Sequence, residues 1–343
     1  MPYTVRSSEK LRKSGADAET KALLYLMNFR NDSNQIYYFV VDFFNDLTGM
    51  DRFSATLWDL QSKANTNNYP KSLGRELVTL FKNYISQVDF SKYILFVGGV
   101  SDNFRIDPSK NTFGIDNVTE KAMSSLKSGL IDEARKKEYI EKSFITDEKV
   151  NVFLKKVLFV IDDKQPRDYV KAIIKNHPTI IPEDKILDAI FNEIRDIQAS
   201  KKNISNVEGI TIQTVDEALN YYRHLTTNEI RLLTLQRIIN RDPVEQGIPF
   251  SFVRILNSCP PERQKDLIDD CQSTLCRALF NKNAAESFWS IFENIYNIII
   301  ASPQDDVQSI YSKLDHNLCI ASPDFDVHSL KYFISVVKDG IQR

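Results

Sequence analysis

The sequence predicts an α/β N-terminal domain, in which helices flank a mixed sheet, followed by an all-α C-terminal domain. The chain has 343 residues, and a typical domain length of about 150 residues favours two domains. Runs rich in β-branched and aromatic residues are concentrated in the first 163 residues, whereas helical periodicity dominates after Pro166. We therefore expect one domain at residues 1–163 and a second at residues 164–343.

The first domain is expected to run helix, strands, helix, strand. A helix over 16–30 has an inner apolar stripe of Ala22, Leu23 and Leu26. IYYFVVDFF (36–44) and ATLWDLQSKA (55–64) have strand composition, and the connection between them contains Gly49. The remaining expected elements are a helix at 72–86, a buried strand at 93–100, a polar loop at 101–116, a helix at 117–142 and a strand at 151–162.

The second domain is expected to consist of successive amphipathic helices, several of them separated by prolines. Apolar side chains recur at helical spacing from Phe288 to Ile299, which is typical of a helical core, and some of this stripe is equally compatible with a subunit or partner interface. The predicted helices cover residues 167–176, 183–199, 215–224, 227–240, 262–281, 284–300, 304–314 and 326–338.

Composition excludes several classes of protein. Hydrophobic residues make up 42% and charged residues 26% of the chain, which is ordinary globular usage. No segment resembles a signal peptide, and the longest apolar run is short and contains Asp42, so we expect a cytoplasmic protein with no membrane span. The four cysteines and four histidines have no zinc-ligand spacing. The net charge of -2 argues against general coating of nucleic acid, and the pair Lys201 and Lys202 is expected to be a solvated face.

Oxygen-bearing side chains gather around the two predicted strands. Asp46 follows the first strand in FFNDLTG, and Asp59, Gln61 and Lys63 alternate along the second, so these three share one face. A hairpin would bring Asp46 to them. Carboxylate and amide oxygens are ligands that Mg²⁺ prefers, and a lysine can orient water and offset negative charge. Alternatively, Asp46 starts a turn, Asp59 pairs with Lys63, and Gln61 lies on an exposed strand.

Further polar residues are candidates for the same site. Glu19 lies on the apolar stripe of the first helix and is either a metal ligand or a favourable first-turn acid. Asp42 is a reserve ligand. Lys71 and Arg75, opposite the apolar stripe of the second helix, either contact DNA phosphates or form a solvated face.

These residues and this element order resemble the PD-(D/E)xK nuclease superfamily. The matching stretches are SGADAETKAL, VVDFFNDLTG and WDLQSKA, and more loosely YILFVGG. The resemblance is closer to the double-stranded DNA endonuclease domains that act as effectors in bacterial anti-phage defence systems of the CBASS, Lamassu and HerA-associated types, where Gln-x-Lys commonly replaces Glu-x-Lys. It implies catalytic roles for Asp46, Gln61 and Lys63, and a Mg²⁺ or Mn²⁺ ion held by Asp46, Gln61 and Glu19.

The resemblance also implies regulation, because such effectors are silent until infection. The helical domain is the expected regulator, through homo-oligomerisation or through a partner ATPase, SMC-like or HerA-type. Relatives that sense cyclic oligonucleotides carry an α/β sensor, whereas residues 167–343 show helical patterns. The rival hypothesis is a non-catalytic interaction or adaptor protein with a degenerate nuclease fold, because Gln61 in place of an acid removes one negative charge from the site.

Overall fold

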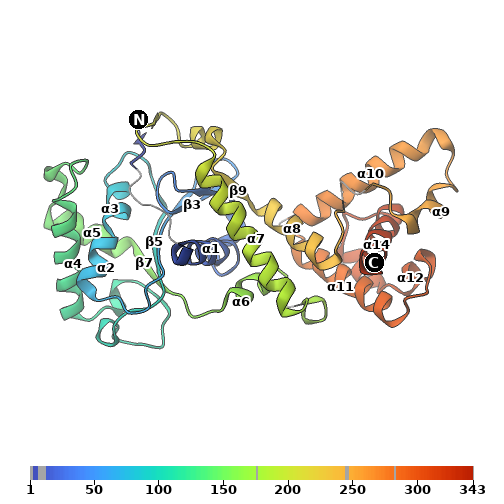
Figure 1. Ribbon diagram of the computed structural model, residues 1–343, viewed down its shortest axis with the longest axis horizontal. Helices are drawn as coiled ribbons and strands as arrows, with labels where there is room; N and C mark the ends of the chain where they lie inside the picture. The colour runs from blue at the N-terminus through green and yellow to red at the C-terminus, as the bar shows by residue number, and fades with distance from the viewer. Residues whose placement is uncertain (1–2, 7–12, 175–176, 244–246, 282, 343) are drawn as a thin grey trace. The chain divides into compact units, whose positions relative to one another are not determined.

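A computed structural model describes residues 3–6, 13–174, 177–243, 247–281 and 283–342 (Figure 1). The chain divides into two compact units. The first comprises Met1–Tyr169 with Phe191–Thr227, and the second Val170–Ile190 with Asn228–Arg343. This division is discontinuous, whereas the sequence predicted a single boundary near residue 163.

The first unit is built on a seven-stranded mixed sheet, which confirms the predicted α/β fold class. The strand order is β6-β7-β5-β4-β3-β2-β9. The central strands β4, β5 and β7 are parallel, and all other neighbours are antiparallel. The strands are β2 (Ile36–Val41), β3 (Leu47–Asp51), β4 (Leu57–Lys63), β5 (Lys92–Val97), β6 (Thr112–Phe113), β7 (Val157–Ile161) and β9 (His224–Thr226).

Helices cover both faces of this sheet (Figure 1). Helix α1 (Lys13–Asn28) packs on β2, β3 and β4, and the Thr20 hydroxyl links it to Gln198 of α7 (Asp184–Asn203) at 2.9 Å. The opposite face carries α2 (Pro70–Glu76), α3 (Val78–Tyr84), α4 (Glu120–Ala134) and α5 (Asp147–Lys156).

Two strand predictions in the first unit need correction. The connection that contains Gly49 is itself a strand, β3, which pairs with β2 and β4. The predicted strand over 151–162 begins only at Val157, because the residues before it finish α5. The Thr146 side chain caps this helix by accepting from the Lys149 amide, and basic residues fill its last turn.

The predicted helix over 215–224 is also wrong, and the difference explains the discontinuous unit. Val215–Tyr221 is a 3₁₀ turn, Tyr222 has a left-handed φ of 57°, and the chain then enters β9. Strand β9 pairs with β2, so a segment of the expected helical domain completes the sheet. Nearby, β8 (Thr211–Ile212) pairs with the N-terminal strand β1 (Tyr3–Thr4).

The C-terminal region is all-helical from α10 onward, as predicted. The stripe on α11 is core, since Phe288, Trp289 and Phe292 are buried among α11 and α14 residues. The remaining α-helices of the described residues are α6 (Pro166–Lys171), α8 (Thr227–Ile239), α9 (Val253–Leu256), α10 (Pro261–Phe280), α11 (Ala285–Ala301), α12 (Val307–Lys313), α13 (His316–Ala321) and α14 (Val327–Ile341). Among the residues described above, none of the helices has both the length and the apolar character to cross a membrane.

Candidate active site

The turn between β2 and β3 carries Asp46. Its ends are joined by the Asp42 amide, which donates to the Asp46 carbonyl at 3.1 Å, and Asp42 has a left-handed φ of 49°. Between them, Phe43 and Phe44 are buried in the core. The two aromatic side chains anchor the turn and leave the carboxylates of Asp42 and Asp46 at its two ends.

A buried polar network fixes the backbone of this turn. The Phe44 carbonyl accepts from Asn83 Nδ2 at 3.1 Å, from the Tyr3 hydroxyl at 3.2 Å and from Lys82 Nζ at 3.4 Å. The Tyr3 hydroxyl also lies 2.8 Å from Asn83 Oδ1, and Asn83 Nδ2 donates to Asp59 Oδ2 at 2.8 Å. Burial raises the pKa of Asp59 to about 7 and lowers that of Lys82 to about 8.

The structure brings Asp46 and Gln61 together. Because Leu47 pairs with Leu60 in the antiparallel β3–β4 ladder, the next residues in register are Asp46 and Gln61. Asp46 Oδ2 accepts hydrogen bonds from Gln61 Nε2 at 2.7 Å, from the Ser62 amide at 2.9 Å and from Ser62 Oγ at 3.1 Å. The Asp46 carboxylate is therefore held directly against the Q-x-K segment.

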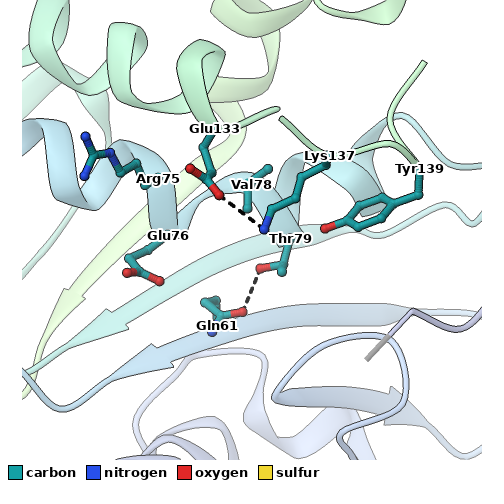
Figure 2. A pocket seen from close by; sticks show the side chains of 8 residues that line it. All are labelled: Gln61, Arg75, Glu76, Val78, Thr79, Glu133, Lys137 and Tyr139. Carbon is teal, nitrogen blue, oxygen red and sulfur yellow. Dashed lines mark hydrogen bonds and ion pairs between the residues drawn. The ribbon is translucent and has the colours of Figure 1, made fainter. Parts of the chain in front are cut away.

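Gln61 and Lys63 both point toward α2 and α3. Gln61 Oε1 accepts from the Thr79 hydroxyl at 2.7 Å (Figure 2). Lys63 Nζ lies 3.2 Å from Glu76 Oε2. Asp59 shares this face but is fully buried and bonded to Asn83, so it does not pair with Lys63 as the alternative interpretation expected.

A polar pocket of about 240 Å³ opens beside Gln61 (Figure 2). Arg75 belongs to its wall, whereas Lys71 forms an ion pair with Asp132 of α4 at 2.8 Å. Of the two predicted DNA-contacting residues, Arg75 is thus the one beside the Q-x-K segment. The pocket is lined by Gln61, Arg75, Glu76, Val78, Thr79, Glu133, Lys137 and Tyr139.

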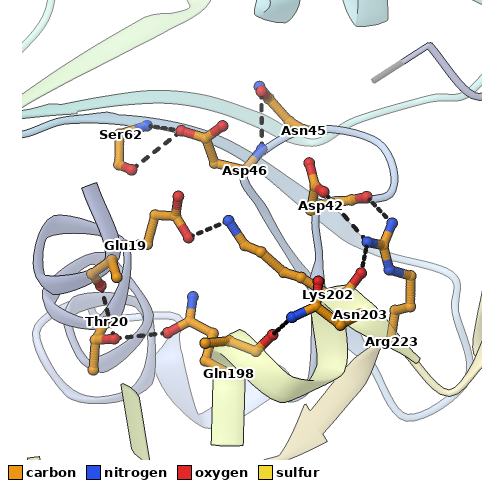
Figure 3. A network of polar contacts seen from close by, with 12 residues as sticks. Glu19, Thr20, Asp42, Asn45, Asp46, Ser62, Gln198, Lys202, Asn203 and Arg223 are labelled. Atoms are coloured by element: carbon orange, nitrogen blue, oxygen red, sulfur yellow. Dashed lines mark hydrogen bonds and ion pairs between the residues drawn. The ribbon is translucent and has the colours of Figure 1, made fainter. Parts of the chain in front are cut away.

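Glu19 lies across the sheet, on α1, with a partner that the sequence did not indicate. Its Oε2 is 2.5 Å from Nζ of Lys202, near the end of α7 (Figure 3). Burial raises the pKa of Glu19 to about 7; Lys202 opposes this shift, and the negative charges of Asp46 and Asp42 add to it. Glu19 therefore lies within electrostatic reach of Asp46, although it is not on the face of Gln61.

Arg223 completes this side of the turn. Its Nη1 donates to the Asp42 carbonyl at 2.7 Å, its Nη2 lies 3.4 Å from Asp42 Oδ2, and Nη2 also donates to the Lys202 carbonyl. The expectation that Lys202 belongs to a solvated face is wrong, since 9% of its side chain is exposed. The only sequence signal for it was the basic pair at the end of an amphipathic helix.

The donor chemistry of these residues fits a hard divalent cation. Asp46 and Glu19 offer carboxylate oxygens and Gln61 an amide oxygen, although Gln61 must rotate its amide by half a turn to direct that oxygen toward Asp46. The Lys202 ammonium already forms an ion pair with the Glu19 carboxylate. Within the described residues, however, no group of three or more His, Cys, Asp or Glu side chains is arranged to hold a metal ion.

Comparison with known proteins adds no identity. No protein-family model, curated protein or solved structure matches this chain.

Proposed function

We propose that this chain is a metal-dependent endonuclease that cuts double-stranded DNA as an effector of a bacterial anti-phage defence system. The observation that carries the proposal is the 2.7 Å contact between Asp46 and Gln61, two residues before Lys63, within a helix-strand-strand-strand-helix-strand core. This geometry supports the resemblance that the sequence motif indicated, because the loosely spaced aspartate and the Q-x-K segment meet in space.

Each residue has a defined part in this proposal. Asp46, Gln61 and Glu19 would hold Mg²⁺ or Mn²⁺ through their side-chain oxygens. When bound, the ion stabilises negative charge on the phosphate and makes water a stronger nucleophile. Lys63, which is 19% exposed and pairs with Glu76, would offset negative charge on the DNA phosphate.

The test is cleavage of supercoiled plasmid by the purified full chain with Mg²⁺. Asp46→Asn keeps an oxygen that accepts from Ser62 but loses the charge, so we expect a folded protein with cleavage reduced at least a hundredfold, as for loss of a charge-stabilising group. Lys63→Ala should lose activity similarly, and Lys92→Ala, at an exposed position on β5, is the matched control. Wild-type rates for either site variant would refute the assignment.

The rival proposal, a non-catalytic adaptor, has one observation in its favour. The Gln61 amide nitrogen, not its oxygen, faces Asp46, so the position is satisfied by hydrogen bonds without a metal. A folded wild-type chain that neither binds Mn²⁺ nor cuts DNA, alone or with products of neighbouring genes, would favour the adaptor.

Regulation through the helical region stays part of the proposal. Self-association or docking to an SMC-like or HerA-type ATPase would bring several weak DNA contacts together and so raise affinity despite the net charge of -2. Ile248, Phe250 and Val253 are all exposed within one short segment, and Phe250, at 87%, is the residue chosen to test such a contact. Light scattering should show larger particles for the wild type than for Phe250→Ser across a concentration series. Truncation near residue 163 is unsuitable because it removes β9 from the sheet.

A further inference from the structure

Lys202 is the cation of a buried cluster of acids. Its Nζ is 2.5 Å from Glu19 Oε2, and the exposed fractions of the two side chains are 9% and 12%. Figure 3 shows Lys202 extending from α7 toward Glu19, with Asp46 near this pair and Asp42 beside Arg223. Three carboxylates face two cations here, Lys202 and the Arg223 that binds Asp42.

Gln198 is a second, independent observation at this cluster: a buried amide with an unsatisfied atom. It is 2% exposed, and its Nε2 has no hydrogen-bond partner among the described residues. In Figure 3 the Gln198 amide nitrogen points toward the space between Glu19 and Lys202. Gln198 Nε2 thus lacks, among the described residues, the hydrogen-bond partner that buried polar atoms ordinarily have.

The orientation of the Gln198 amide follows from the hydroxyl of Thr20. That hydroxyl lies 2.9 Å from both the Ala16 carbonyl and Gln198 Oε1, but it has one proton to donate. When it donates to Ala16, it can accept from Gln198 Nε2, and the amide then turns its oxygen toward the cluster. A neutral oxygen beside Glu19 is a ligand of the kind that Mg²⁺ or Mn²⁺ takes.

Lys202 also has room to leave the cluster. It lines a pocket of about 330 Å³ together with Asn203, Ser205, Asn206, Val207, Glu208 and Arg223. A four-carbon side chain with rotatable bonds can move its ammonium into such a space without a backbone change.

We propose that Lys202 is an internal competitor of the divalent cation. Its ammonium neutralises the cluster of Glu19, Asp42 and Asp46, and metal binding at Glu19 displaces it toward the pocket at 202–208. This inference rests on the proposed metal-dependent function. Two cations at one carboxylate repel each other, so removing the ammonium should favour the metal.

The test is Mn²⁺ binding to the full chain, measured by isothermal titration calorimetry for the wild type, Lys202→Met and the neighbouring control Lys201→Met. We expect Lys202→Met to bind Mn²⁺ on the order of tenfold more tightly, within the usual range of coupling between two sites. Its melting temperature should fall in EDTA, because Glu19 loses its counter-charge, and should rise more with Mn²⁺ than that of the wild type. Lys201→Met should match the wild type in both measurements.

A double variant keeps the inference testable if Lys202→Met does not fold. Glu19→Gln with Lys202→Met removes both charges of the pair, so it avoids an unpaired buried charge. In this double variant the loss of the Glu19 ligand and the loss of the competing ammonium oppose each other, so its Mn²⁺ affinity is compared with that of Glu19→Gln, which loses the ligand alone. The double variant should bind Mn²⁺ more tightly than Glu19→Gln, because Asp42 and Asp46 no longer face the ammonium. The inference would be overturned by an Mn²⁺ affinity of folded Lys202→Met equal to that of the wild type, or by an affinity of the double variant equal to that of Glu19→Gln.

The plasmid assay separates this inference from the proposed function. If the wild type cuts DNA but Lys202→Met binds Mn²⁺ as the wild type does, the competition is refuted and the nuclease stands. If Lys202→Met gains Mn²⁺ affinity but the wild type never cuts, the competition stands and the nuclease is refuted.

Discussion

The close packing of α2 on α4 permits a sharp test of the fold that supports Lys63. Gly74 and Gly129 let the two backbones approach so closely that a Cβ added at Gly74 would lie 2.0 Å from the Leu126 carbonyl oxygen. A Cβ at Gly129 would similarly lie 2.1 Å from the Lys71 carbonyl oxygen. We predict that Gly74→Ala destabilises the first unit, although alanine is the better helix former.

The magnitude follows from two opposing effects. Alanine gains about 1 kcal/mol of helix propensity over glycine. Ordinary van der Waals contact begins near 3.4 Å. The added Cβ and the Leu126 carbonyl oxygen, 2.0 Å apart, would therefore have to separate by a further 1.4 Å (3.4 minus 2.0 Å). The clashing atoms are backbone and cannot rotate away, so the overpacking cost is at or above the usual upper end of about 3 kcal/mol. We expect a net loss of about 2 kcal/mol or more.

The assay is urea unfolding of the full chain followed by tryptophan fluorescence. The chain has two tryptophans, of which Trp58 lies in β4 and Trp289 in α11. A Trp289→Phe background therefore leaves Trp58 as the reporter of the first unit. Gly15→Ala is the matched control, since it lies in α1 and an added Cβ would meet no atom of the described residues within 4 Å beyond its chain neighbours and its own helix backbone.

Gly15→Ala should leave the free energy of unfolding unchanged or raise it by up to about 1 kcal/mol. If Gly74→Ala is as stable as its parent, or gains as Gly15→Ala does, the close approach of α2 and α4 is refuted.

Three other outcomes are expected. EDTA should abolish plasmid cleavage and added Mg²⁺ should restore it; full activity in chelator would exclude the proposed chemistry. Tyr3→Phe should lower the free energy of unfolding by about 1 kcal/mol, because Asn83 loses a buried donor, and unchanged urea unfolding would contradict this. Burial lowers the pKa of Lys82 from 10.5 to about 8, so between these values the unfolded chain binds more protons and stability rises with pH. From pH 7 to 9.5 the wild type should gain on the order of 2 kcal/mol relative to Lys82→Met in urea unfolding, whereas a constant difference would show that Lys82 is not perturbed.

Much of the local architecture was predictable because it depends on short-range pattern. The alternation along β4 correctly placed Asp59, Gln61 and Lys63 on one face, and the helical period of α11 identified core residues. The approach of Asp46 to Gln61 was expected from a hairpin between residues 36–44 and 55–64, but it comes from the pairing of β4 with β3, a strand that the sequence did not predict. The short apolar segments were less decisive: residues 151–156 suit a helix or a strand, and the capped start of α5 favours the helix.

By itself, the sequence determined the fold class and the face of β4 that carries Gln61 and Lys63, because periods of two and of 3.6 residues depend on neighbouring positions alone. Only the tertiary structure decided that residues 191–227 return to the first unit, that Lys202 enters the cluster of Glu19, and that Phe44 is held by distant donors. The donors to Phe44 lie 38 to 41 positions from it in the chain, Lys202 is far more distant from Glu19, and Lys202 acts as a buried cation only because packing covers it. Such pairings arise from packing of the whole chain, and no local pattern records them.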